Sequence, residues 1–88
     1  MNPFIQQIVN QRINQVSAEE LYQQAAQMQI PVSEEQARQI ADQVRGKNID
    51  LFTTSGQQTL MAILKRELGP EMADELYQYF QQIMEKFK

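Results

Sequence analysis

The sequence predicts an all-α fold, a compact bundle of about five short helices in a single domain spanning residues 1–88. Three observations predict it. Apolar residues recur at intervals of three and four along most of the chain, as they do on one face of a helix. No segment shows the sustained apolar and polar alternation of a half-buried strand. The three prolines and three glycines fall almost entirely where helices would begin or end.

Each of the first three helices follows a recognisable start signal. Asn2 can cap a helix, and Pro3 suits the first helical position because its missing N–H would have no partner there. Ser17 and Ser33 each have Glu or Gln three residues later, the capping box in which side chain and backbone satisfy each other. Pro31 disfavours helical backbone at the preceding residue and so ends the second helix. These signals predict helices over residues 3–15, 18–29 and 34–45.

Glycines separate the last helices. Gly46 suits the left-handed residue that follows the third helix. Thr54 or Ser55 can cap the fourth helix. Gly69 and Pro70 end that helix and begin the fifth within two residues. The remaining predicted helices cover residues 56–68 and 70–87.

The fifth helix carries the most regular apolar face of the chain. Met72 and Tyr79 lie on one shoulder of its central stripe, and Tyr77 and Met84 lie on the other, so that the arc spans about 160° where about 100° is enough to face a core. Either neighbouring helices bury both shoulders, or one shoulder forms a helix-binding or dimer surface, since Tyr and Met are favoured in interfaces. The stripe itself consists of Ala73, Leu76, Phe80, Ile83 and Phe87.

The first helix has an apolar arc of about 180° with Arg12 in its middle. A guanidinium cannot remain unpaired in apolar surroundings, so three arrangements are open. Arg12 lays its stem on the apolar surface and reaches water, or pairs with a carboxylate such as Asp42 or Asp50, or lies inside an interface with a partner or a second copy. The arc consists of Phe4, Ile5, Ile8, Val9, Ile13 and Val16.

Composition excludes most small-enzyme chemistry. The chain has no Cys, His or Trp, which removes thiol nucleophiles, imidazole bases and the usual zinc ligand sets. Its adjacent acidic residues stand at or near helix starts, where capping and the helix dipole account for them. We therefore expect a protein that is not an enzyme and needs no cofactor.

The sequence is rich in Gln, with 16 in 88 residues, but these are interleaved with apolar residues as on solvated helix faces.

Location and partners follow from the same composition. The N-terminus lacks a signal peptide's basic start, and no apolar run approaches the ~20 residues of a membrane span, so we expect a cytoplasmic protein with no membrane partner. A net charge of −3 argues against nucleic acid. The second and third helices resemble a helix-turn-helix only in outline, because Glu34 and Glu35 would point at the DNA. We expect a protein partner or a homodimer; the alternative is a nucleic-acid-associated regulator acting through Arg38, Arg45 and Lys47.

Several segments in order resemble a known family. The motif Arg-Gly-Lys-Asn-Ile-Asp-Leu-Phe over residues 45–52 is similar to the hallmark of a family of short Bacillus-type proteins of unknown function, often called YqfT-like. Segments 10–14, 17–21, 33–37 and 69–73 are similar too, so the resemblance covers nearly the whole chain. Residues 53–58, Thr-Thr-Ser-Gly-Gln-Gln, depart from the more Lys-rich start of the fourth helix that members often carry. The resemblance implies a cytoplasmic Firmicutes protein of one small domain, and it brings no catalytic residue, ligand or partner. A vaguer likeness to a small sporulation-regulator family leaves a regulatory role open.

Overall fold

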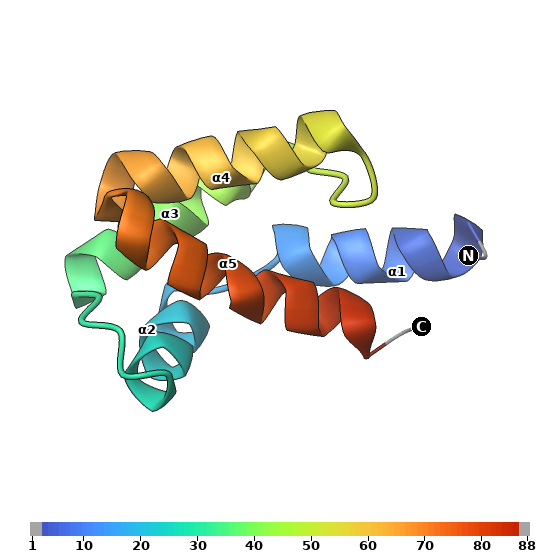
Figure 1. The fold of residues 1–88 in the computed structure, drawn as a ribbon. Coiled ribbons are helices and arrows are strands. Elements are labelled where there is room, and N and C mark those ends of the chain that lie inside the picture. The colour runs from blue at the N-terminus through green and yellow to red at the C-terminus, as the bar shows by residue number, and fades with distance from the viewer. Residues whose placement is uncertain (1–2, 87–88) are drawn as a thin grey trace.

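Five helices account for most of the chain in the computed structural model, which describes residues 3–86 (Figure 1). No strand occurs within these residues, so the predicted all-α fold is confirmed. None of the helices described is both long and apolar enough to cross a membrane. In chain order the helices are α1 (Pro3–Asn14), α2 (Ala18–Gln27), α3 (Glu34–Val44), α4 (Thr54–Leu68) and α5 (Pro70–Glu85).

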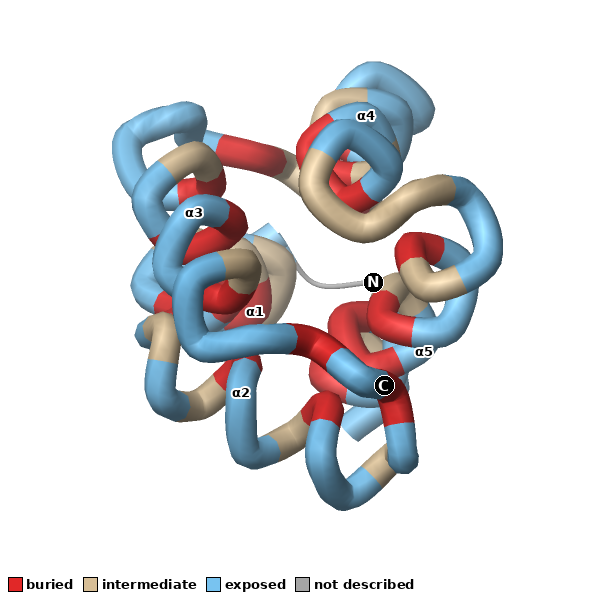
Figure 2. Tube along the Cα trace, turned by 90° about the vertical axis from the view of Figure 1, so that its left-hand side faces the viewer, coloured by how far each residue is buried: buried red, intermediate tan, exposed pale blue. Residues whose placement is uncertain are grey.

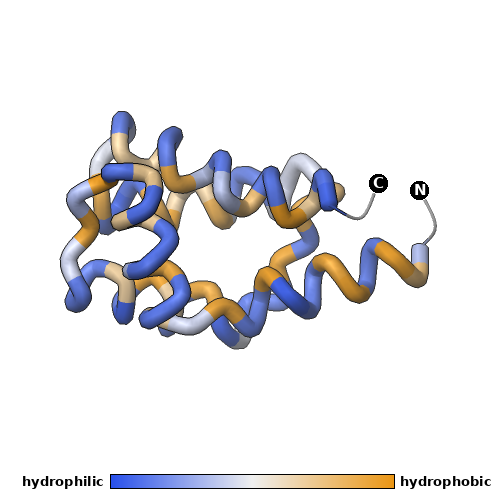
Figure 3. Tube along the Cα trace, turned by 90° about the horizontal axis from the view of Figure 1, so that it is seen from below, coloured by the Kyte–Doolittle hydropathy of each residue, from blue (hydrophilic) through white to orange (hydrophobic). Residues whose placement is uncertain are grey.

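The helices pack on one another in chain order, except for the first. α2 packs on α3, α3 on α4 and α4 on α5, whereas α1 contacts the last helix, α5. The start of α1 and the end of α5 consequently lie at the same end of the molecule (Figures 1 and 3). The whole measures 35 × 22 × 20 Å. Every helix turns its buried residues toward a common interior (Figure 2).

The core is mainly aliphatic and contains two large aromatic side chains, Phe80, which is fully buried, and Tyr79. The central stripe predicted for α5 is confirmed through Ile83, which is 5 % exposed; Phe87 lies outside the described residues. Residues 45–53 form the connector between α3 and α4, and Leu51 within it is also fully buried. Among the described residues no polar or charged residue belongs to the buried class, so the core is held together by apolar packing.

Each helix differs from the prediction at one end: α1 and α3 end one residue early, α2 and α5 end two residues early, and α4 begins two residues early. α2 ends at Gln27, two residues early, because a Schellman motif closes it: the Ile30 N–H donates to Ala25 O at 2.8 Å and the Gln29 N–H to Ala26 O at 3.1 Å. Gln29 takes the left-handed position with a φ of 62°, although Gly is usual there. The motif turns the chain so that Ile30 is buried.

The fourth helix starts two residues earlier than predicted. Its cap is Thr53, whose Oγ1 accepts from the Gly56 N–H at 3.0 Å, and neither Thr54 nor Ser55 has this role. Of the two predicted capping boxes, the one at Ser33 is complete. At Ser17 the hydroxyl accepts from the Glu20 N–H at 3.1 Å as expected, but the Glu20 carboxylate turns mainly toward other partners.

Candidate functional site

The outer face of α1 carries the most exposed large apolar side chain of the described chain. Phe4 is 68 % exposed and Ile8, one turn further on, is 40 % exposed. The buried residues of α1, Val9 and Ile13, lie on the opposite side, toward the interior. Two exposed glutamines share the outer side, which we call the α1 face and define as Phe4, Gln7, Ile8 and Gln11.

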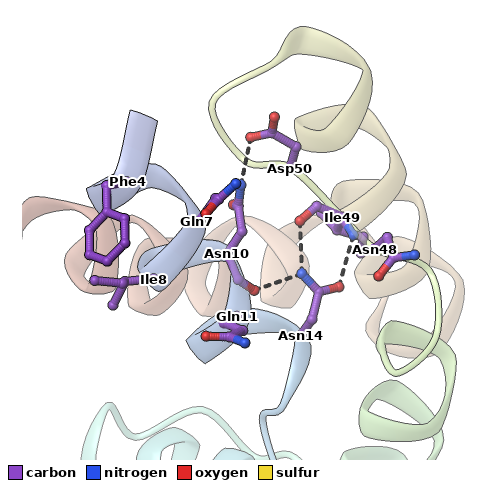
Figure 4. Close-up of a pocket in the computed structure, with 9 residues that line it drawn as sticks. All are labelled: Phe4, Gln7, Ile8, Asn10, Gln11, Asn14, Asn48, Ile49 and Asp50. Carbon is purple, nitrogen blue, oxygen red and sulfur yellow. Dashed lines mark hydrogen bonds between the residues drawn. The ribbon is translucent and has the colours of Figure 1, made fainter. Parts of the chain in front are cut away.

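A hollow of about 420 Å³ lies beside the α1 face, between α1 and the connector that precedes α4 (Figure 4). Phe4 and Ile8 line one end of it, and amide side chains line the other. The hollow is open to solvent and lies outside the apolar core. Its lining consists of the α1 face together with Asn10, Asn14, Asn48, Ile49 and Asp50.

Two asparagines of α1 fix the connector in place. The Asn14 side chain makes two hydrogen bonds to the backbone of Ile49. Its Nδ2 donates to Ile49 O and its Oδ1 accepts from the Ile49 N–H, each at 2.8 Å. Asn10 donates to Asp50 Oδ1 at 2.8 Å (Figure 4) and also accepts from the Leu51 N–H at 3.1 Å. These bonds satisfy backbone N–H and C=O groups of the connector that have no partner in a helix or strand. They therefore hold this wall of the hollow in one conformation.

The connector is also shaped by its own residues. Asn48 takes the left-handed conformation with a φ of 52°, which Asn tolerates better than most residues. Asp50 Oδ1 accepts from the Phe52 N–H at 3.0 Å, forming a local turn. Neither α1 asparagine was assigned a role from the sequence. Their signal was present, since Asn10 and Asn14 stand four apart inside a helix, where Asn is a poor helix former unless its amide has a partner.

Arg12 is paired, but not with either carboxylate that the sequence analysis offered. Its guanidinium forms a two-pronged ion pair with Glu20 of α2, in which Nη1 lies 3.1 Å from Oε1, so Asp42 and Asp50 were the wrong partners. The Tyr79 hydroxyl of α5 donates to the same carboxylate. One carboxylate thus joins α1, α2 and α5. Sequence reasoning gave Glu20 only a capping role.

The pKa values of this cluster follow from its geometry. Burial alone would raise the pKa of Glu20, but hydrogen bonds from Arg12 and Tyr79 outweigh it, and the pKa lies below its ordinary value. The bond to Glu20 raises the pKa of Arg12. Burial, with the hydrogen bond to Glu20, raises the pKa of Tyr79 to about 12. The cluster therefore stays ionised at Arg12 and Glu20 and neutral at Tyr79 throughout the physiological range, as a fixed structural contact does.

The shoulders of α5 are mostly covered. Tyr79 is 7 % exposed, and Met72, Tyr77 and Met84 are half-buried against the core. Burial raises the pKa of Tyr77 as well. Neighbouring helices bury Tyr79, which explains why the apolar arc of α5 extends to it. None of the four shoulder residues is exposed, so they form no continuous exposed apolar surface.

The three cations offered for nucleic acid do not form a clear positive surface. The Arg38 guanidinium forms an ion pair with Glu35, one turn earlier on α3, and the charge of Asp42 also acts on it. Arg45 and Lys47 are exposed at the far end of α3. Residues 34–47 together hold three acidic and three basic residues, so this stretch has no net charge. Within residues 3–86, no cluster of three or more acidic, His or Cys side chains could hold a metal ion.

Comparison with known proteins agrees with the sequence motifs. Residues 1–84 match a family described as "Protein of unknown function (DUF2624)". The uncharacterized protein YqfT of Bacillus subtilis (strain 168) is 30 % identical over 77 residues, which cover 88 % of this chain and 92 % of that protein. No solved structure shows a significant match to the chain. The predicted YqfT-like resemblance is confirmed, and the chain belongs to the DUF2624 family.

Proposed function

We propose that the protein is a cytoplasmic interaction module, not an enzyme, and that it binds another protein chain through the α1 face. The exposure of Phe4 and Ile8 on one side of the same helix carries this proposal. Large apolar side chains that share an exposed face are typical of contact surfaces, whereas single ones need no explanation. The hollow beside this face could accept a protruding side chain of the partner.

This proposal moves the contact from the residues chosen on sequence alone. Tyr79 and Arg12 are occupied inside the protomer by Glu20. Met72, Tyr77 and Met84 lie half-buried against the core, so each offers a partner only part of its surface. The large apolar side chains of the α1 face are more exposed, with Phe4 at 68 % and Ile8 at 40 %. We therefore assign the main contact to α1 and give the α5 residues at most a peripheral part.

The experiment is a size measurement after brief chemical cross-linking of intact cells that express the protein. We expect the wild-type chain in a complex larger than its 10.3 kDa and the variant Ile8→Glu at the size of the free chain. Tyr22→Glu is the matched control, because Tyr22 is 39 % exposed, almost the same as Ile8, but lies on α2. Absence of a larger species, or a complex that survives Ile8→Glu, would contradict the proposal.

The alternative, a nucleic-acid-associated or sporulation-type regulator acting through Arg38, Arg45 and Lys47, makes a different prediction. Binding would weaken steeply as salt rises, because phosphate contacts release counterions. A titration with short duplexes at low and physiological salt separates the two proposals. The balanced charge of residues 34–47 favours the protein partner.

A further inference from the structure

The partner of the α1 face can be specified further, and this inference rests on the proposed function. We propose that the face binds the same face of a second copy, as a two-fold dimer in which the two α1 helices run antiparallel. Ile8 would pack on its counterpart near the two-fold axis. Each Phe4 would enter the far end of the hollow on the other copy.

Charge favours a second copy as the occupant. The protein has a net charge of −3, so two copies repel each other over most of their surfaces. α1 is the exception, because it contains no Asp or Glu, and its one charged residue, Arg12, is bound to Glu20. Among the described residues that line the hollow, Asp50 is the only charged one, and its Oδ1 already accepts from Asn10 and from the Phe52 N–H. A charged partner would find little to pair with here, whereas a second α1 face meets no like charge.

Shape favours the same occupant. Phe4 protrudes at the beginning of α1, and the amide-lined end of the hollow lies beside Gln11 and Asn14, about 10 to 15 Å further along the helix (Figure 4). An antiparallel two-fold pair brings the beginning of each helix next to the end of the other, so each Phe4 meets the hollow of its partner. Protrusion and hollow thus fit each other only when the second helix runs in the opposite direction.

The polar rim also suits this contact. The side chains of Gln7, Gln11 and Asn48 are exposed and make no hydrogen bond to any residue in the described part of the chain. An amide both donates and accepts, so identical amides can bond to one another across a two-fold axis. The predicted interface therefore has an apolar centre and a rim of amides, the usual anatomy of a contact between proteins.

The test uses the absence of cysteine in the natural chain. In the purified variant Ile8→Cys the only thiol lies near the predicted axis, so mild oxidation should link two chains, as seen by intact mass. Tyr22→Cys, with a similarly exposed position on α2, should remain single under the same conditions. Equal linking of the two variants, or none at position 8, would overturn the dimer.

A charge exchange tests the symmetry directly. Ile8→Glu and Ile8→Lys should each associate at least about 100-fold more weakly than wild type in sedimentation measurements, because like charges meet at the axis. An equimolar mixture of the two should associate again. Helix content by circular dichroism controls for folding. If the mixture stays monomeric while the cross-linked complex in cells still depends on Ile8, the partner is a different protein; the dimer is then wrong and the proposed function stands. If that complex is absent from cells as well, both fail.

Discussion

Replacing Gly56 by Ala should lower the free energy of unfolding, although Ala is the better helix former. Gly56 lies in the first turn of α4 and is buried against the connector. A Cβ placed there would lie 1.8 Å from Asp50 O and 2.5 Å from Asp50 C, both backbone atoms. Ordinary contact needs about 3.5 Å, so the connector and the helix would have to separate by about 1.7 Å.

The size of the effect can be worked out from its parts. Forcing a methyl group into a packed site costs roughly 3 kcal/mol when backbone must move. The same movement weakens the Thr53 cap, which is worth about 1 kcal/mol. Ala regains about 1 kcal/mol of helix propensity over Gly. The net loss is about 3 kcal/mol in the free energy of unfolding, which for a domain of this size lowers Tm by roughly 12 to 24 °C.

Urea unfolding followed by circular dichroism measures this loss. Gln58→Ala is the matched control, because Gln58 is an exposed residue of the same helix and the change should leave the unfolding free energy within about 0.5 kcal/mol. A Gly56→Ala variant as stable as wild type, or more stable, would refute the close approach of α4 to the connector.

Three further predictions concern the contacts that join the helices. Asn14→Leu removes both bonds to Ile49 and leaves backbone groups of the connector unpaired, so urea unfolding should show a loss of about 2 kcal/mol, and equal stability would contradict the clamp. The lowered pKa of Glu20 stabilises the fold above the ordinary carboxyl pKa, and this contribution is lost as pH falls through the lowered value; Glu20→Gln should therefore show a weaker loss of stability in acid than wild type, as measured by urea unfolding at several pH values. The raised pKa of Tyr79 stabilises the fold below pH ~10, the ordinary value, and that contribution disappears as pH rises toward 12; Tyr79→Phe should abolish the last tyrosine ionisation in an ultraviolet titration, and its persistence would show that another tyrosine is responsible.

The α1 face and the α5 residues differ in how well the sequence predicted them. The apolar arc of α1 included Phe4 and Ile8, so the composition of the face was predictable, but which part of that arc is exposed was not. Phe4 and Ile8, at one edge of the arc, remain exposed because α1 packs mainly on α5, which covers the other edge. The interaction residues chosen on α5 show the opposite case: Tyr79 lies on a shoulder of its stripe, and other helices cover it.

The sequence by itself determined the five helices, most of their ends to within one residue, and the family. These features depend on residues close together in the chain: a cap and the N–H groups it satisfies, a proline and the residue before it, an apolar stripe every three or four residues. Such local signals act whatever the rest of the fold does.

Only the tertiary structure decided the contacts between distant residues. Glu20 binds both Arg12 and the Tyr79 hydroxyl, which is 59 residues away in the chain, and Asn14 binds the Ile49 backbone 35 residues away. Each of these polar groups had several partners of the right chemistry within the chain, and hydrogen bonds act only at short range and in narrow geometry. Which partner is reached depends on how the helices pack, because packing decides which side chains come within that range.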